Sequence, residues 1–220
     1  MNGIANNIHR IQQELPSQTQ LVVVSKYREI QEIQAAYDAG QRIFAENRVQ
    51  PLLERVEQLP QNIEWHLIGH LQSNKVKYIA PFIAMIHSVD SLSLLEEIQK
   101  QAAKNKRVIK CLFQLHLAQE DSKFGIKPEK IASFFEGLLP DNYPNIEFAG
   151  IMSMGSLTTD TALTRQEFSK AQALYQSIKA TFFPQLESFK ELSIGMSGDY
   201  QIAIECGSTM VRIGSKVFEV

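Results

Sequence analysis

Eight short apolar runs alternate with segments of helical spacing, and this alternation constrains the fold more than any other feature of the sequence. The runs are rich in apolar and β-branched residues, which predicts strands. They span residues 21–26, 42–47, 64–69, 84–89, 107–117, 146–153, 191–197 and 210–214. Strands that alternate with helices imply right-handed βαβ crossovers and a parallel sheet. Eight such units predict an α/β chain folded as a closed (β/α)8 TIM barrel rather than as an open sheet.

An extra helix is predicted before the first strand. Apolar side chains recur there at spacings of three or four residues, at Ile4, Ile8, Ile11 and Leu15. This spacing is typical of an amphipathic helix, and Pro16 marks its end.

The chain length fits one barrel. Barrels of this kind occupy 200 residues or more as one domain, and the chain has 220 residues with no linker rich in Pro, Gly or Ser. Hydrophobic residues make up 44% and charged residues 21%, which is ordinary globular usage. We therefore expect a single domain over residues 1–220.

Polar residues close the predicted strands, where barrels of this kind build their active sites. Alternation along a strand places Lys26 on the face of Val22 and Val24, and Arg212 on the face of Met210 and Gly214. The first and last strands become neighbours when a barrel closes. Two cations that approach the same mouth favour an anion between them.

Two glycine-bearing turns suggest that this anion is a phosphate. The segments "GMSGD" (residues 195–199) and "RIGSK" (residues 212–216) follow the seventh and eighth strands. They offer free backbone N–H groups, helix or turn N-termini, and the hydroxyls of Ser197 and Ser215, and such donors cradle phosphate. The loops after these two strands form the recurrent phosphate site of such barrels.

Lys26 then suggests a cofactor. A partly desolvated lysine near a guanidinium is expected to favour the neutral amine, which is a nucleophile toward aldehydes. With the phosphate turns, and with Arg212 placed to address a ring nitrogen, this arrangement predicts pyridoxal 5′-phosphate held as an internal aldimine on Lys26. The alternative is a lysine that only extends its amine from the barrel rim into solvent.

Several motifs resemble one known family. "VVVSK", "FAENRVQ", "WHLIGHLQSNKVK", "IHSVDS", "SKFGI" and "SIGMSGDYQIAIECGSTMVRIG" are similar, in order and across nearly the whole chain, to the pyridoxal phosphate homeostasis proteins of the YggS/PROSC family. The resemblance implies a single barrel like that of alanine racemase, with pyridoxal phosphate covalently bound to Lys26. It implies further cofactor-binding residues: Asn47 and His70 beside the cofactor, Met196 lining the site, Ser197, Gly214 and Ser215 on the phosphate, and Arg212 facing the pyridine nitrogen.

Two positions depart from the family pattern. Ala45 stands where the family has glycine in F-G-E-N, which adds a methyl group where glycine permits close approach. Glu219 stands where the family has glycine in I-F-G. We expect both changes to leave the cofactor turns intact.

The expected function is a cofactor carrier or regulator in vitamin B6 and amino-acid homeostasis, with little or no catalysis. Catalysis on an amino acid needs a positioned acid or base besides the lysine. Alanine racemases supply one from a second domain and a dimer partner, for which 220 residues leave no room once eight strands are counted. The alternatives are an amino-acid racemase or lyase, and a Schiff-base aldolase that uses Lys26 without a cofactor. A racemase or lyase would take its base from His70, Lys75, His116 or Tyr200.

The expected partners are pyridoxal phosphate and apo-enzymes that depend on it, and we expect a cytoplasmic monomer. A net charge of −2 argues against nucleic acid, and no run approaches the roughly 18 apolar residues of a membrane span. The polar N-terminal segment lacks the apolar core of a signal peptide. The histidines and the two cysteines do not form a metal motif. Lys123 is a second amine expected at the rim.

Overall fold

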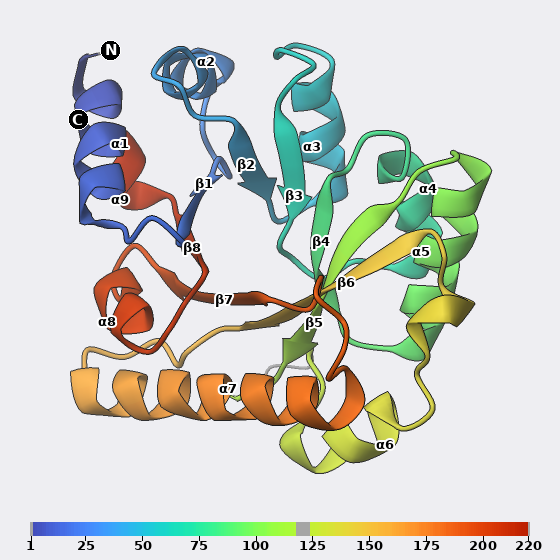
Figure 1. Ribbon diagram of the computed structural model, residues 1–220. Helices are drawn as coiled ribbons and strands as arrows, with labels where there is room; N and C mark the ends of the chain where they lie inside the picture. Colours follow the sequence, from blue (N-terminus) through green and yellow to red (C-terminus); the bar gives the residue numbers. More distant parts are fainter. Residues whose placement is uncertain (1, 118–123, 220) are drawn as a thin grey trace.

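The eight predicted strands close into a parallel barrel in the computed structural model, which describes residues 2–117 and 124–219. The strands are β1 Gln20–Val24, β2 Ile43–Glu46, β3 Glu64–Leu67, β4 Met85–Val89, β5 Ile109–Leu115, β6 Ile146–Ser153, β7 Glu191–Met196 and β8 Met210–Ile213. Each pairs in parallel with the next, and β1 pairs with β8. The predicted (β/α)8 barrel with an additional N-terminal helix is confirmed (Figure 1).

Helices surround the barrel and connect its strands (Figure 1). The α-helices are α1 Asn2–Glu14, α2 Ile30–Asp38, α3 Val49–Val56, α4 Val76–Ile79, α5 Leu92–Lys104, α6 Ile131–Phe135, α7 Thr161–Phe182, α8 Tyr200–Glu205 and α9 Ser215–Phe218. Short 3-10 turns occur at Ser73–Lys75, Pro128–Lys130 and Pro140–Asn142.

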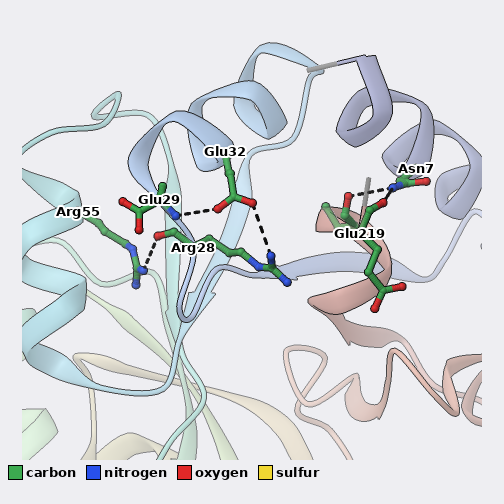
Figure 2. A network of polar contacts seen from close by, with 7 residues as sticks. Asn7, Arg28, Glu29, Glu32, Arg55 and Glu219 are labelled. Carbon is green, nitrogen blue, oxygen red and sulfur yellow. Dashed lines mark hydrogen bonds and ion pairs between the residues drawn. The ribbon is translucent and has the colours of Figure 1, made fainter.

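Helix α1 packs beside α9, so the two ends of the chain lie together (Figure 1). Ile4, Ile8 and Ile11 are buried on one face of α1, as their spacing predicts. On the same helix, Asn7 Nδ2 donates to the carbonyl oxygens of Val217 at 3.2 Å and Glu219 at 2.7 Å (Figure 2). These bonds attach α1 to the segment that follows β8. Glu219 has φ −70°, so this position does not require glycine.

Apolar side chains form two separate layers because successive residues of a strand point to opposite sides of the sheet. Inside the barrel lies a small cluster of buried residues: Val22, Val24, Ala45, Met85, Leu112, Ala149, Met152 and Met210. A much larger cluster lies between the strands and the helices. The methyl group of Ala45, which departs from the family pattern, is fully buried in the inner cluster.

Most strands end one or two residues earlier than the sequence predicts, and the first strand shows why. β1 ends at Val24 because the chain turns immediately afterwards: the Arg28 N–H donates to the Ser25 carbonyl at 3.1 Å. Within this turn Tyr27 has φ +64°. Lys26 therefore lies in a turn and not in the strand, and α2 begins only four residues later.

Candidate functional site

A cavity of about 540 Å³ opens at the carboxyl ends of the barrel strands. All eight residues that the sequence predicts for the site line it: Lys26, Asn47, His70, Met196, Ser197, Arg212, Gly214 and Ser215. They follow β1, β2, β3, β7 and β8 or lie at the ends of these strands. The barrel thus brings together residues that are up to 189 positions apart in the chain, such as Lys26 and Ser215 (215 − 26). That they bind a cofactor stays a prediction.

Lys26 lines this cavity but is exposed to solvent, which corrects one expectation. The sequence predicts partial burial because Lys26 follows a buried strand. In the structure Val24 and Ser25 are buried, and the turn then carries Lys26 out of the barrel wall. Its amine is therefore available to a ligand without being desolvated by the protein alone.

Close backbone packing places Asn47 beside the end of β3. A Cβ atom built on Gly69 would lie 2.1 Å from the Asn47 carbonyl oxygen, so only glycine fits at this position. The next residue, His70, places Nδ1 3.6 Å from Asp90 Oδ2 and stacks on Phe124 with ring centroids 3.8 Å apart. Both contacts hold the imidazole at the cavity wall.

The two predicted phosphate turns lie against each other. The Gly214 N–H donates to Ser197 Oγ at 3.1 Å, so this N–H is engaged and not free as the sequence suggests. A Cβ atom on Gly214 would approach the Val24 carbonyl oxygen to 3.1 Å, whereas one on Gly198 would meet no atom of the described residues within 4 Å. The two turns therefore form one concave surface with open space over Gly198.

Asp199 holds the first of these turns. Its Oδ1 accepts the Met196 N–H at 2.5 Å. The pKa of Asp199 is raised above its usual value because the side chain is buried. This hydrogen bond and the nearby Arg212 act in the opposite direction but do not cancel the effect of burial. The carboxylate thus fixes the backbone of the turn and faces the guanidinium.

Arg212 forms part of the cavity floor and is 3% exposed. Nη1 donates to the Ser193 carbonyl at 2.7 Å and to Ser193 Oγ at 2.6 Å, and Nη2 donates to the Ser153 carbonyl at 3.0 Å. Burial lowers the pKa of Arg212 to about 10, and Asp199 opposes this shift. The guanidinium is still charged at neutral pH, and these bonds do not use all five of its N–H donors.

Two buried histidines continue this polar network inside the barrel, and sequence reasoning did not assign them to it. His87 Nδ1 lies 3.2 Å from Ser193 Oγ, and His87 Nε2 lies 3.0 Å from His66 Nδ1. Burial, with Lys110 as a smaller cause, lowers the pKa of His66 to about 3. Burial, His66 and Arg212 hold the pKa of His87 well below its usual value. Alternation on β3 would have identified His66, because Ile68 on the same face packs against the inner cluster.

Exposed apolar side chains surround the cavity mouth. Tyr27 is 79% exposed, Phe124 41% and Met154 40%, and all three line the cavity. Met152 is buried in the inner cluster, but Met154 lies at the mouth.

The four candidate bases lie at different places relative to the main cavity. His70 lines the cavity, whereas Lys75 lines an adjoining cavity of about 440 Å³ that shares Asn47 and His70 with the first. Tyr200 donates to Glu14 Oε2, and burial together with this carboxylate raises its pKa to about 12. Neither Tyr200 nor His116 is among the described residues that line the main cavity. Lys123 lies outside the described residues.

The described part of the chain contains no group of three or more His, Cys, Asp or Glu side chains placed to share a metal ion. None of its helices has both the length and the apolar character needed to cross a membrane.

The family model of the alanine racemase N-terminal domain matches residues 1–220. A pyridoxal phosphate homeostasis protein of Vibrio alginolyticus is 35% identical, with 99% of this chain and 97% of the relative covered. The protein of the same name from Pasteurella multocida is 33% identical, with 98% and 96% covered.

Solved structures agree with these relatives. PipY of Synechococcus elongatus, in a structure with pyridoxal phosphate bound, has a TM-score of 0.89 and 33% identity, with 98% of this chain and 99% of PipY covered. An alanine racemase from Bartonella henselae has a TM-score of 0.73 at 18% identity, with 100% of this chain and 59% of the racemase covered. The racemase likeness shows the fold alone. The chain therefore belongs to the pyridoxal phosphate homeostasis protein family, whose barrel is that of the alanine racemase N-terminal domain.

Proposed function

We propose that this chain binds pyridoxal phosphate in the main cavity and acts in the cytosol in vitamin B6 and amino-acid homeostasis. The observation that carries the proposal is the meeting of an exposed amine, a buried guanidinium and two serine turns in one cavity, in a chain that is 33% identical to PipY, whose structure holds pyridoxal phosphate. The cavity volume of about 540 Å³ falls within the range of small-molecule sites.

The residues present fit this cofactor. Ser197, Gly198 and Ser215 surround open space suited to a phosphate, while Arg212 has N–H donors left for a ring nitrogen. Lys26 Nζ would attack the aldehyde carbon, and the carbonyl oxygen would leave as water. When bound, pyridoxal phosphate supplies an electrophilic aldehyde and an electron-withdrawing ring.

The direct test is a spectral titration of the full chain with pyridoxal phosphate, followed by borohydride reduction. We expect saturable yellow colour, a spectral change on addition of a primary amine, and a reduced adduct that remains after denaturation. A chain that stays colourless at saturating aldehyde would contradict the proposal and favour a cofactor-free lysine enzyme.

The phosphate turns give a second prediction. Replacing Ser197 with alanine removes one hydroxyl from the phosphate surface and the acceptor of the Gly214 N–H. We expect the affinity for pyridoxal phosphate to fall about tenfold, the effect of one charge-assisted hydrogen bond. Binding of pyridoxal, which lacks the phosphate, should not change. Ser93→Ala on the exposed face of α5 is the matched control, and equal losses for both ligands would contradict the assignment.

We further propose that the chain carries or regulates the cofactor with little or no turnover. His70, alone among the four candidate bases, belongs to the described lining of the main cavity, and it is engaged with Asp90 and Phe124. The measurement is exchange of the α-proton of a panel of amino acids in heavy water. We expect the loaded chain to exchange this proton no faster than the same concentration of free pyridoxal phosphate does. Rapid exchange or inversion would instead establish a racemase or lyase.

Delivery to other enzymes is tested separately. The loaded chain is mixed with an apo-enzyme that needs pyridoxal phosphate, and recovered activity is compared with that from the same amount of free cofactor. We expect transfer at least as fast as from free cofactor, and we expect the chain to sediment as a monomer. Retention of the cofactor would restrict the role to storage or regulation.

A further inference from the structure

The turn that carries Lys26 is held from outside the cavity by one buried carboxylate. Ser25 Oγ donates to Glu46 Oε1 at 2.5 Å, and the Ser25 N–H donates to the Ala45 carbonyl at 3.0 Å. Ser25 and Glu46 are both fully buried. The start of the turn is thereby attached to the end of β2.

The same carboxylate holds the other end of the turn through an arginine. Arg55, on α3 and 8% exposed, forms an ion pair with Glu46 Oε1. Its Nη2 donates to the Arg28 carbonyl at 3.0 Å, as Figure 2 shows. Figure 2 also shows that Arg28 continues into α2, where its side chain meets Glu32 and the Glu29 N–H donates to Glu32. Glu46 and Arg55 thus hold both ends of a four-residue segment with Lys26 inside it.

The backbone of this segment needs such support. Tyr27, the residue after Lys26, has φ +64°, a left-handed conformation that disfavours residues with a Cβ atom. Strain of this kind persists only where the surroundings impose it, and it gathers at functional sites. Packing of the Tyr27 ring cannot impose it, because the side chain is 79% exposed. The described contacts that remain are those of Ser25 with Glu46 and Ala45, and those of Arg28 with Arg55, Glu32 and Phe218.

A contribution to the stability of the fold does not explain well why Glu46 and Arg55 form a buried ion pair. Glu46 Oε2 is buried and has no hydrogen-bond partner among residues 2–117 and 124–219, and burial raises the pKa of this carboxyl despite Ser25 and Arg55. A buried ion pair is often no more stabilising than apolar residues of similar volume. Neither Glu46 nor Arg55 belongs to the cavity lining in the part of the chain that the structure describes, so we expect any effect on a ligand to pass through the turn.

We propose that Glu46 and Arg55 are positioning residues that hold the Ser25–Arg28 turn so that Lys26 Nζ points at the aldehyde carbon of the ligand. The proposal rests on the proposed function for the identity of the ligand. It predicts that weakening the pair impairs covalent attachment more than binding of the phosphate and ring.

Two variants test this without removing the pair's volume. Glu46→Gln keeps an acceptor for Ser25 but removes the charge that holds Arg55, whereas Ser25→Ala cuts the link to the turn and leaves the ion pair intact. The matched control is Glu205→Gln, which breaks the exposed ion pair with Arg165 between α7 and α8.

Each variant is titrated with pyridoxal phosphate and with pyridoxine phosphate, which has the same ring and phosphate but a hydroxymethyl group in place of the aldehyde. We expect Glu46→Gln and Ser25→Ala to slow borohydride-trappable attachment about tenfold or more, the order of effect of a misplaced reacting group. Affinity for pyridoxine phosphate should stay within about twofold of the parent chain. If the pair served stability alone, the attachment rate and the affinity for pyridoxine phosphate would fall equally, and the proposal would be wrong. An unchanged attachment rate would also overturn it.

A third readout does not depend on the cofactor. The Arg28 amide, bonded to the Ser25 carbonyl at 3.1 Å, should exchange with solvent faster in both variants than in the parent or in Glu205→Gln. If the parent chain binds neither ligand, the proposed function fails, and unchanged amide exchange would separately overturn the positioning role.

Discussion

Replacement of Lys26 by alanine is expected to abolish covalent retention of pyridoxal phosphate completely. The amine supplies the nitrogen of the bond to the aldehyde carbon, and no other lysine is among the described residues that line the main cavity. After borohydride reduction and denaturation, mass spectrometry should find the cofactor adduct on the parent chain at Lys26 and no adduct on the variant. The matched control is Lys104→Ala at the exposed end of α5, which should retain the full adduct.

The variant should lose the covalent bond and keep its fold. Lys26 is exposed and lies after β1, so its side chain contributes little to the core. We expect the free energy of unfolding to stay within about 0.5 kcal/mol of the parent. Pyridoxine phosphate should still bind, because Ser197, Ser215 and Arg212 remain. An adduct of equal yield at another lysine, such as Lys123, would show that Lys26 is not the attachment site.

Acid is expected to destabilise this barrel as His66 and His87 become protonated in the unfolded chain. Their folded pKa values lie below the usual value of 6.5, at about 3 for His66, because burial opposes charge. Below pH 6.5 the unfolded state therefore binds more protons than the folded state, so stability falls as pH falls. The stability contributed by neutral histidines is fully present above pH 6.5. For His66, whose folded pKa is about 3, the cost between pH 6.5 and pH 5 should be about 2 kcal/mol, and His87 should add a cost in the same direction.

The measurement is urea unfolding of the ligand-free chain at pH 7 and pH 5. In the parent, His66 should account for a loss of about 2 kcal/mol between these pH values, and His87 should add to that loss. His87→Gln removes one titrating group, so its loss should be smaller than that of the parent even if the variant is less stable at pH 7. His9→Gln, at an exposed position of α1, should retain the parent's dependence. An unchanged pH dependence in His87→Gln would show that His87 is not held neutral by the fold.

Local sequence patterns predicted most of the fold because strand and helix periodicities are short-range properties. The β6 bounds agree with the prediction, and the other strands differ by one to two residues at their ends. The errors arise where the chain turns sharply, as after Val24, since turn geometry depends on contacts with other segments. Helix α1 followed directly from its apolar spacing.

The candidate site was predicted in its members but not in its surroundings. Strand ends meet at one mouth of a barrel, so Lys26 and Arg212 could be placed together from topology alone, and the structure pairs their strands. The links from Arg212 through Ser193 to His87, and from Ser25 through Glu46 to Arg55, join residues that lie between 9 and 106 positions apart in the chain and come from different strands and helices. Such pairings need the register of neighbouring strands, which no local pattern supplies.

The barrel, its strand order and the residues at its mouth could be predicted from the sequence, because alternation of apolar residues and closure of eight βα units leave few other arrangements. Three features became visible only in the folded chain: Lys26 is exposed in a turn beside Tyr27 with its positive φ, Arg212 is buried against Ser193 and Ser153, and Arg55 pairs with the buried Glu46. Exposure, burial and hydrogen bonding depend on what packs around a residue in three dimensions, and residues that are neighbours along the chain do not set them.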